Sequence, residues 1–239
     1  MFRYRIAPVQ LSFNWASGYA TGTREIDYLL ADPKNFSLHE QQNFIEKFIP
    51  ITDGGLTLPS KMMSEVRRPR RTRGKLGVFC RPMRLHEQFL THLKKISDQT
   101  GHVVRFSHYQ YGDAESLEFY TNYLKTLGFD ASQVEVKNEA LDEGIQEVDF
   151  AIDSWPIGSP ATTKDLCYAR LPVFVWSQGT FSSQILSREL MISLGLEHLL
   201  FSDIDELILK VVEKQYDVET VSQQELIRKI EHRMHRASN

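Results

Sequence analysis

The feature that most constrains the fold is an alternation that begins near residue 75. Short runs rich in β-branched residues are separated there by segments whose apolar residues have helical spacing. The runs that we expect to form strands are 75–80, 102–106, 134–136, 148–152 and 172–176. The segments that we expect to form helices are 85–96, 114–127, 141–147 and 161–169. Such an alternation is typical of βαβ units. With right-handed crossovers it predicts an α/β fold with a Rossmann-like, doubly wound parallel sheet.

The first 64 residues have a different pattern. A polar, Gly-containing loop at 14–24 lies between two expected strands, and a helix and a third strand follow it. These expected elements are strands 9–13, 28–31 and 48–51 and helix 38–46. Because this is too little chain for a complete second α/β domain, we interpret 1–64 as a small, partial N-terminal α/β segment.

Two other segments flank the expected Rossmann-like domain at 76–216. The basic run at 65–75 contains Pro, Gly and like charges that repel one another, which is typical of a surface linker. The alternative is that this run binds nucleic acid, an anionic membrane or an acidic partner. At the C-terminus, 217–239 has apolar residues four apart and predicts an amphipathic helix.

Charge and cysteine content narrow the classes of function. The 239 residues carry 28 basic and 31 acidic side chains and a net charge of −3, which argues against a dedicated nucleic-acid-binding protein. Two cysteines, Cys80 and Cys167, cannot form a disulfide framework. There is no apolar run of about 18 residues for a membrane span. The first residues also lack the apolar stretch of a signal peptide. We therefore expect a cytoplasmic protein.

The segment 153–165 is the most informative for chemistry. An expected buried strand ends at Asp153, a loop of Gly, Pro and Ser follows, and a helix begins near Ala161. A helix N-terminus leaves main-chain N–H groups unpaired beside the positive end of the helix dipole. At the carboxyl edge of a parallel sheet, such a turn favours a phosphate or pyrophosphate. The hydroxyls of Thr162 and Thr163 would add donors, and Asp165 could accept hydrogen bonds from a ribose.

Simpler interpretations of these residues remain open. Ser159 or Thr162 could merely cap an ordinary helix. The eight histidines have no metal-ligand spacing, so no metal site is expected. No P-loop, Ser-His-Asp elbow or Cys-x-x-Cys motif is present.

Several runs in the same order resemble those of the O-linked N-acetylglucosamine transferases and their bacterial relatives. In the C-terminal part these runs are Asp153-x-x-Pro156, 161–166 (ATTKDL), 169–173 (ARLPV), 179–185 (GTFSSQI) and 195–196 (GL). In the N-terminal part they are 7–10 (APVQ), 18–23 (GYATGT) and 26–32 (IDYLLAD). Together the two ordered matches cover roughly 200 residues, in the family's order and spacing.

This resemblance implies a fold and an activity. The family has two facing Rossmann-like domains, the GT-B arrangement, and the matched part would be its C-terminal half. Its members transfer a sugar from a uridine diphosphate (UDP) donor to protein side chains. The implied partners are therefore a nucleotide sugar and a protein or peptide acceptor, with no metal and no resident cofactor. The family's upstream half, which carries its active-site His, precedes the matched segment, and no catalytic residue is assigned. A partner chain or a longer polypeptide would then supply that half. The alternative is a non-catalytic nucleotide-sugar-binding or assembly partner of a complete glycosyltransferase.

The resemblance also assigns donor-binding residues in the C-terminal part. Thr162 matches the second Thr of the family's diphosphate-binding pair, whereas Ala161 replaces the first. Asp165 matches the Asp expected to contact the ribose, and Gly158 and Ser159 lie in the flexible turn.

At the remaining assigned positions the sequence departs from the family's pattern. Tyr19, Thr21 and Gly22 match a loop that faces the active site, although Ala20 replaces its Pro. The family's pyrophosphate-binding Lys is missing after the first strand of the domain, where Arg81 or Arg84 could supply the positive charge. Asn138 and Leu141 stand where the family has a Lys and a His near the uracil.

Overall fold

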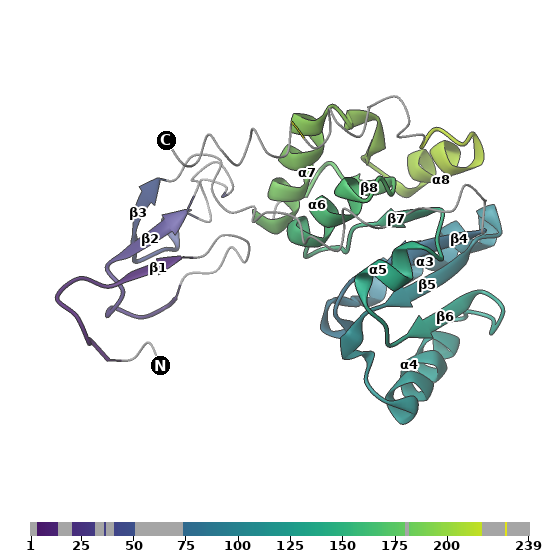
Figure 1. Ribbon diagram of the computed structural model, residues 1–239, viewed down its shortest axis with the longest axis horizontal. Helices are drawn as coiled ribbons and strands as arrows, with labels where there is room; N and C mark the ends of the chain where they lie inside the picture. Colours follow the sequence, from purple (N-terminus) through teal and green to yellow (C-terminus); the bar gives the residue numbers. More distant parts are fainter. Residues whose placement is uncertain are drawn as a thin grey trace.

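The computed structural model describes residues 4–13, 21–31, 36, 41–50, 74–179, 182–216 and 228. Two parallel sheets account for the strands of these residues, one with three strands and one with six. Figure 1 shows the three-stranded sheet to one side of the larger unit.

The larger sheet has the topology predicted from the alternation. Its strands are β4 (Lys75–Val78), β5 (Val103–Ser107), β6 (Val134–Lys137), β7 (Phe150–Ile152), β8 (Val173–Trp176) and β9 (Leu200–Phe201). Their order is β6-β5-β4-β7-β8-β9, and every pair is parallel. The chain moves outward from β4 to β6 and then returns to start β7 on the other side of β4. The carboxyl ends of β4 and β7 therefore mark the topological switch point.

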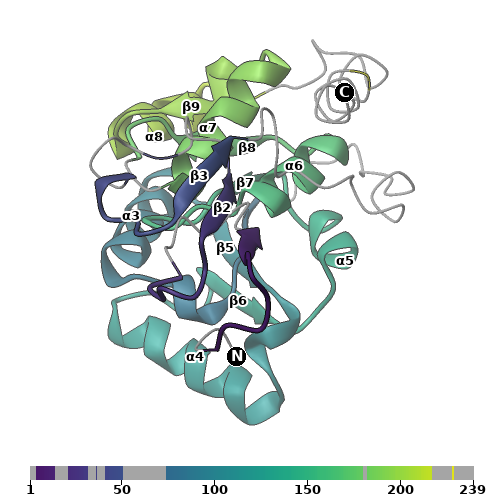
Figure 2. The ribbon, with the colours of Figure 1, turned by 90° about the vertical axis from the view of Figure 1, so that its left-hand side faces the viewer.

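Helices cover both faces of this sheet. They are α3 (Glu87–Thr100), α4 (Ala114–Thr126), α5 (Leu141–Ile145), α6 (Pro160–Tyr168), α7 (Ser182–Leu194) and α8 (Ile204–Val212). Three short 3-10 turns complete the unit: η2 (Pro82–Arg84), η3 (Tyr109–Tyr111) and η4 (Glu197–Leu199). Figure 2 shows α3 and α8 on one side of the sheet and α5 and α6 on the other. This is the doubly wound α/β arrangement that the sequence predicts.

The local sequence signals explain the predicted helices. In α3, apolar residues spaced three and four apart lie in the core at Phe89, Leu90, Leu93 and Ile96. The carboxylate of Asp113 caps α4 by accepting a hydrogen bond from the Ser116 amide at 3.0 Å, as expected.

The three-stranded sheet forms a small unit with its own core. It consists of β1 (Leu11–Phe13), β2 (Tyr28–Ala31) and β3 (Lys47–Pro50). Leu29, Ala31 and Phe36 are buried there, and Phe44 and Phe48 pack against them. The rings of Phe36, Phe44 and Phe48 lie 5.2–5.5 Å apart, at angles favourable for aromatic pairs. These parallel strands agree with the predicted partial α/β segment.

Some expectations differ from the structure or lie outside it. The predicted helix 38–46 is wrong at its end, because Gln41 and Gln42 are helical but the chain has left the helix at Asn43 to enter β3. The sequence did not predict α7, β9 or α8. The predicted linker at 65–75 lies outside the described residues up to residue 73. The predicted C-terminal helix at 217–239 also lies outside them, apart from Arg228.

Within the part of the chain that the structure describes, none of the helices combines the length and the apolar character that crossing a membrane requires.

Candidate functional site at the carboxyl edge of the six-stranded sheet

Polar and charged residues follow the strands that meet at the switch point. Arg81 and Arg84 come after β4, His108 after β5, Asn138 after β6 and Asp153 after β7. Because carboxyl ends of parallel strands share one edge of a sheet, these residues gather at the edge where α/β domains bind ligands.

Asp153 organises the turn that connects β7 to α6. One oxygen of its carboxylate, Oδ1, accepts hydrogen bonds from the Ser154 amide at 2.9 Å and the Ser159 amide at 2.8 Å. Inside the loop, the Ser154 hydroxyl donates to the carbonyl oxygen of Ile157 at 2.6 Å. The turn is therefore a closed structure built around one carboxylate.

The turn is also fixed against α7. The Gly158 amide donates to the Ser183 hydroxyl at 3.1 Å. A Cβ atom at Gly158 would lie 3.0 Å from both Asp153 Oδ2 and the main-chain oxygen of Ser183. The reason for glycine here is therefore the narrow space around Cα, because a Cβ would force its neighbours to shift. Backbone conformation is not the reason, since Gly158 is not in the left-handed region.

These contacts differ from one expectation. The amides of Gly158 and Ser159 were expected to face a ligand, but Ser183 and Asp153 already accept their hydrogen bonds. Within the described residues, the amides of Ala161 and Thr162 in the first turn of α6 have no hydrogen-bond partner. Any anion at this turn would therefore meet the start of α6 rather than the preceding bend.

Arg84 joins the two sides of the switch point. Its guanidinium donates to the Gly158 carbonyl at 3.1 Å and to the Ser159 hydroxyl. The structure thus brings together three of the predicted site residues, Arg84, Gly158 and Ser159. Arg81 is exposed.

The electrostatics of the edge are mixed. Burial raises the pKa of Asp153 to about 6, against the opposing effects of the Ser187 hydroxyl, the two amides and Arg84. Burial lowers the pKa of His108, and the positive charges of Arg81 and Arg84 lower it further. A neutral imidazole, two guanidinium groups and a weakly acidic carboxyl group therefore share this edge.

The residues predicted on α6 differ in accessibility. Thr162 is half-buried, but Thr163 is 1% exposed, so its side chain faces the interior. The carboxylate of Asp165 lies 3.4 Å from the ammonium group of buried Lys164. Burial raises the pKa of Asp165, and this charge opposes the shift. The oxygen of Asp165 in this ion pair, Oδ1, is buried and, within the described residues, has Lys164 as its partner. A ribose hydroxyl would be an additional donor to this carboxylate.

Two residues of the predicted active-site loop, Thr21 and Gly22, are described and precede β2 of the three-stranded unit. Tyr19 is outside the described residues. Thr21 donates to the buried carboxylate of Glu46 through its amide at 2.6 Å and through its hydroxyl. Burial opposes ionisation of Glu46, but the hydrogen bonds from Thr21 and from main-chain amides prevail and lower its pKa. Gly22 has a φ of +68°, which favours glycine. These contacts anchor the loop to its own sheet.

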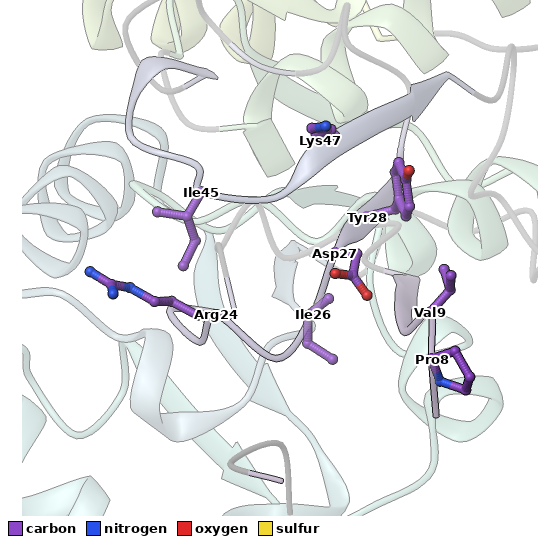
Figure 3. Close-up of a pocket in the computed structure, with 8 residues that line it drawn as sticks. All are labelled: Pro8, Val9, Arg24, Ile26, Asp27, Tyr28, Ile45 and Lys47. Atoms are coloured by element: carbon purple, nitrogen blue, oxygen red, sulfur yellow. The ribbon is translucent and has the colours of Figure 1, made fainter. Parts of the chain in front are cut away.

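A pocket of about 300 Å³ lies at the edge of the three-stranded sheet where its strands begin. Figure 3 shows Asp27 near its centre, with Pro8 and Val9 on one side and Arg24 and Ile45 on the other. These residues precede the strands of the small sheet, so the pocket is at the amino edge. Two hydrogen bonds of 2.9 Å already pair Asp27 with Arg5. The pocket therefore lacks a free polar group at its centre.

Three residues of the site were not predicted from the sequence. Asp153 was noted as the end of a strand and the start of the run Asp153-x-x-Pro156, but neither it nor Ser183 nor His108 was assigned a role in the site. The position of Asp153 and His108 directly after buried strands was the available signal. No sequence signal points to the contact between Gly158 and Ser183. Within the described residues, no group of three His, Cys, Asp or Glu side chains is arranged to hold a metal ion.

Comparisons with known proteins identify the fold. No model of a protein family matches the chain, and neither does any curated protein. Among solved structures, a mutant O-GlcNAc transferase from Thermobaculum terrenum matches with a TM-score of 0.71 and 18% identity, over 97% of this chain and 45% of its own. The crystal structure of TarM matches with a TM-score of 0.55 and 9% identity, over 94% of this chain and 50% of its own. The chain thus spans about half the length of these structures and has the α/β fold of GT-B glycosyltransferases.

Proposed function

We propose that the chain is a GT-B-type glycosyltransferase, or part of one, that binds a UDP-sugar at the carboxyl edge of its six-stranded sheet. The sugar would be transferred to a protein side chain in a cytoplasmic setting. The observation that carries the proposal is the position of Arg84 against the turn before α6, next to the amides of Ala161 and Thr162, which have no partner among the described residues. This position is the switch point of the sheet, where α/β domains bind nucleotides.

Each proposed contact has a physical reason. The Ala161 and Thr162 amides, at the positive end of α6, would hold one phosphate together with the hydroxyl of Thr162. Arg84 would stabilise the charge that develops on the diphosphate as the bond to the sugar breaks. The half-buried carboxylate of Asp165 would accept a hydrogen bond from the ribose. No metal ion or resident cofactor is required, because the protein itself supplies the positive charge.

Calorimetric titration with UDP tests the binding step. We expect measurable heat at millimolar ligand or below, and no heat with the wild-type protein would contradict the proposal. Thr162→Val and Asp165→Ala should each weaken binding by about 1–2 kcal/mol, the usual cost of a lost polar contact. Arg84→Gln should weaken binding more, because its contact with the diphosphate involves two charges. Arg81→Gln is the matched control and should change affinity less, since Arg81 is exposed and Arg84 contacts the turn.

One observation favours a second candidate function. The amides of Gly158 and Ser159 are satisfied within the protein, so the turn keeps its shape without a ligand. A turn of this kind would suit a non-catalytic nucleotide-sugar-binding or assembly partner of a complete glycosyltransferase. Assays of donor hydrolysis and of sugar transfer separate the two functions, first with the chain alone and then with a chain that carries the other half of the fold. Binding of UDP without turnover in either assay would favour the second function.

A further inference from the structure

Asp153 contacts both the sheet and the turn that follows β7. Its main-chain amide still pairs with β8, by donating to the Phe174 carbonyl at 2.9 Å. Its side chain meanwhile accepts the amides of Ser154 and Ser159 at 2.9 and 2.8 Å. The carboxylate therefore connects the rigid sheet to the last residue before α6, and it fixes where α6 begins.

Contacts on the far side of the turn complete this arrangement. The hydroxyls of Ser154 and Ser159 lie 3.1 Å apart, and Arg84 donates to Ser159 from outside. Gly158 fills the narrow space between Asp153 Oδ2 and α7. Moving the carboxylate would therefore displace both Ser159 and the first turn of α6.

We propose that Asp153 is the positioning residue of the phosphate-binding turn and that it takes up a proton when a diphosphate binds there. The proposal rests on the proposed function, because it assumes an anionic ligand at the start of α6. The carboxylate occupies the turn as an internal anion. A diphosphate bound next to it brings further negative charge, which favours the neutral form of Asp153.

The groups around Asp153 make it suitable for this role. Arg84 of η2 is the positive charge that acts on it, and the α7 side chain that acts on it is the hydroxyl of Ser187. Cys80 at the end of β4 and Cys167 of α6 are also within electrostatic reach of Asp153, but burial raises the pKa of each thiol to about 12. His108 is the other group near Arg84 with an ordinary pKa close to neutral. With its own pKa near 6, Asp153 can gain a proton in the physiological range.

Two substitutions of Asp153 distinguish its role as a hydrogen-bond acceptor, which holds the turn in shape, from the effect of its charge. Asp153→Asn keeps an oxygen that can accept the two amides but removes the charge, whereas Asp153→Ala removes both. Affinity for UDP should be measured by calorimetry from pH 5.5 to 8.0, in two buffers with different ionisation enthalpies. UDP and His108 titrate in the same way in every variant, so a difference between wild type and Asp153→Asn belongs to Asp153. The exposed carboxylate of Asp130, between α4 and β6, provides the control Asp130→Asn.

The expected results have definite signs. Relative to Asp153→Asn, the wild type should lose affinity as the pH rises above 6, by at most tenfold per pH unit for one coupled proton. It should also take up more protons on binding. Asp153→Ala should bind about tenfold more weakly than Asp153→Asn at every pH, because two amides lose their acceptor. Asp130→Asn should behave like the wild type.

Two outcomes would overturn the inference alone. In the first, wild type and Asp153→Asn bind UDP with the same pH dependence and proton uptake. In the second, Asp153→Ala binds as tightly as Asp153→Asn. If Asp153→Ala does not fold, as judged by circular dichroism, the comparison of wild type with Asp153→Asn still decides the proton uptake. Absence of UDP binding by the wild type would overturn the proposed function and this inference with it.

Discussion

Asp153 is subject to two opposing effects. The Ser187 hydroxyl, two main-chain hydrogen bonds and Arg84 stabilise the carboxylate, but burial disfavours the charge more strongly, and the pKa rises from 3.8 to about 6. The folded protein therefore holds this proton more tightly than the unfolded chain. The stability that Asp153 contributes is fully present below about pH 3.8 and is lost as the pH rises through about 6.

Substitution of Asp153 tests this sign. Asp153→Asn cannot lose a proton, so the variant should gain stability relative to the wild type as the pH rises from 4 to 7. The measurement is the midpoint of urea unfolding at each pH. Asp130→Asn, which removes an exposed carboxylate, should follow the wild-type curve. Parallel pH curves for wild type and Asp153→Asn would contradict the raised pKa.

At the scale of elements, the features that could be predicted are those whose interacting residues lie close together in the sequence. The buried face of α3 and the cap at Asp113 depend on residues within one or two helical turns, so apolar spacing and residue type were sufficient. The turn before α6 was located from its Gly, Pro and Ser content. Its actual shape depends on Arg84, about 75 positions before it, and on Ser183, 25 positions after it. No local pattern records such contacts, which is why the two amides expected to face a ligand are paired inside the protein.

The packing of the turn against α7 gives a prediction about Gly158. A methyl group there would lie 3.0 Å from atoms of Asp153 and Ser183, which are fixed by the sheet and the helix. Gly158→Ala should therefore cost about 1–3 kcal/mol of stability, the usual cost of overpacking. It should also weaken UDP binding. Gly101→Asn is the control, because Gly101 has a φ of +73° and open space around its Cβ position, and Asn tolerates that conformation. The free energy of unfolding in urea checks both variants, and equal losses would contradict the packing argument.

At the scale of the whole molecule, the alternation of strands and helices was enough to predict the class of fold. The topology of a parallel sheet with right-handed crossovers leaves few arrangements, and the switch point between β4 and β7 follows from them. The short β9 was not predicted, because two residues of strand have no periodicity. The helices α7 and α8 were not predicted either, although the apolar spacing and the Asp203 cap of α8 were available signals. The three-stranded unit is parallel as well, and its pocket is at the amino edge, away from the end of the strands where such sheets bind ligands.

The central claim is that a nucleoside diphosphate binds at the carboxyl edge of the six-stranded sheet. The most direct test is a titration of the isotope-labelled protein with UDP, followed through its amide resonances by NMR. We predict that the signals of Ala161, Thr162 and Arg84 shift with increasing UDP and that those of Asp27 and Lys47, in the amino-edge pocket, do not. Shifts confined to Asp27 and Lys47, or no shifts at all, would contradict the claim.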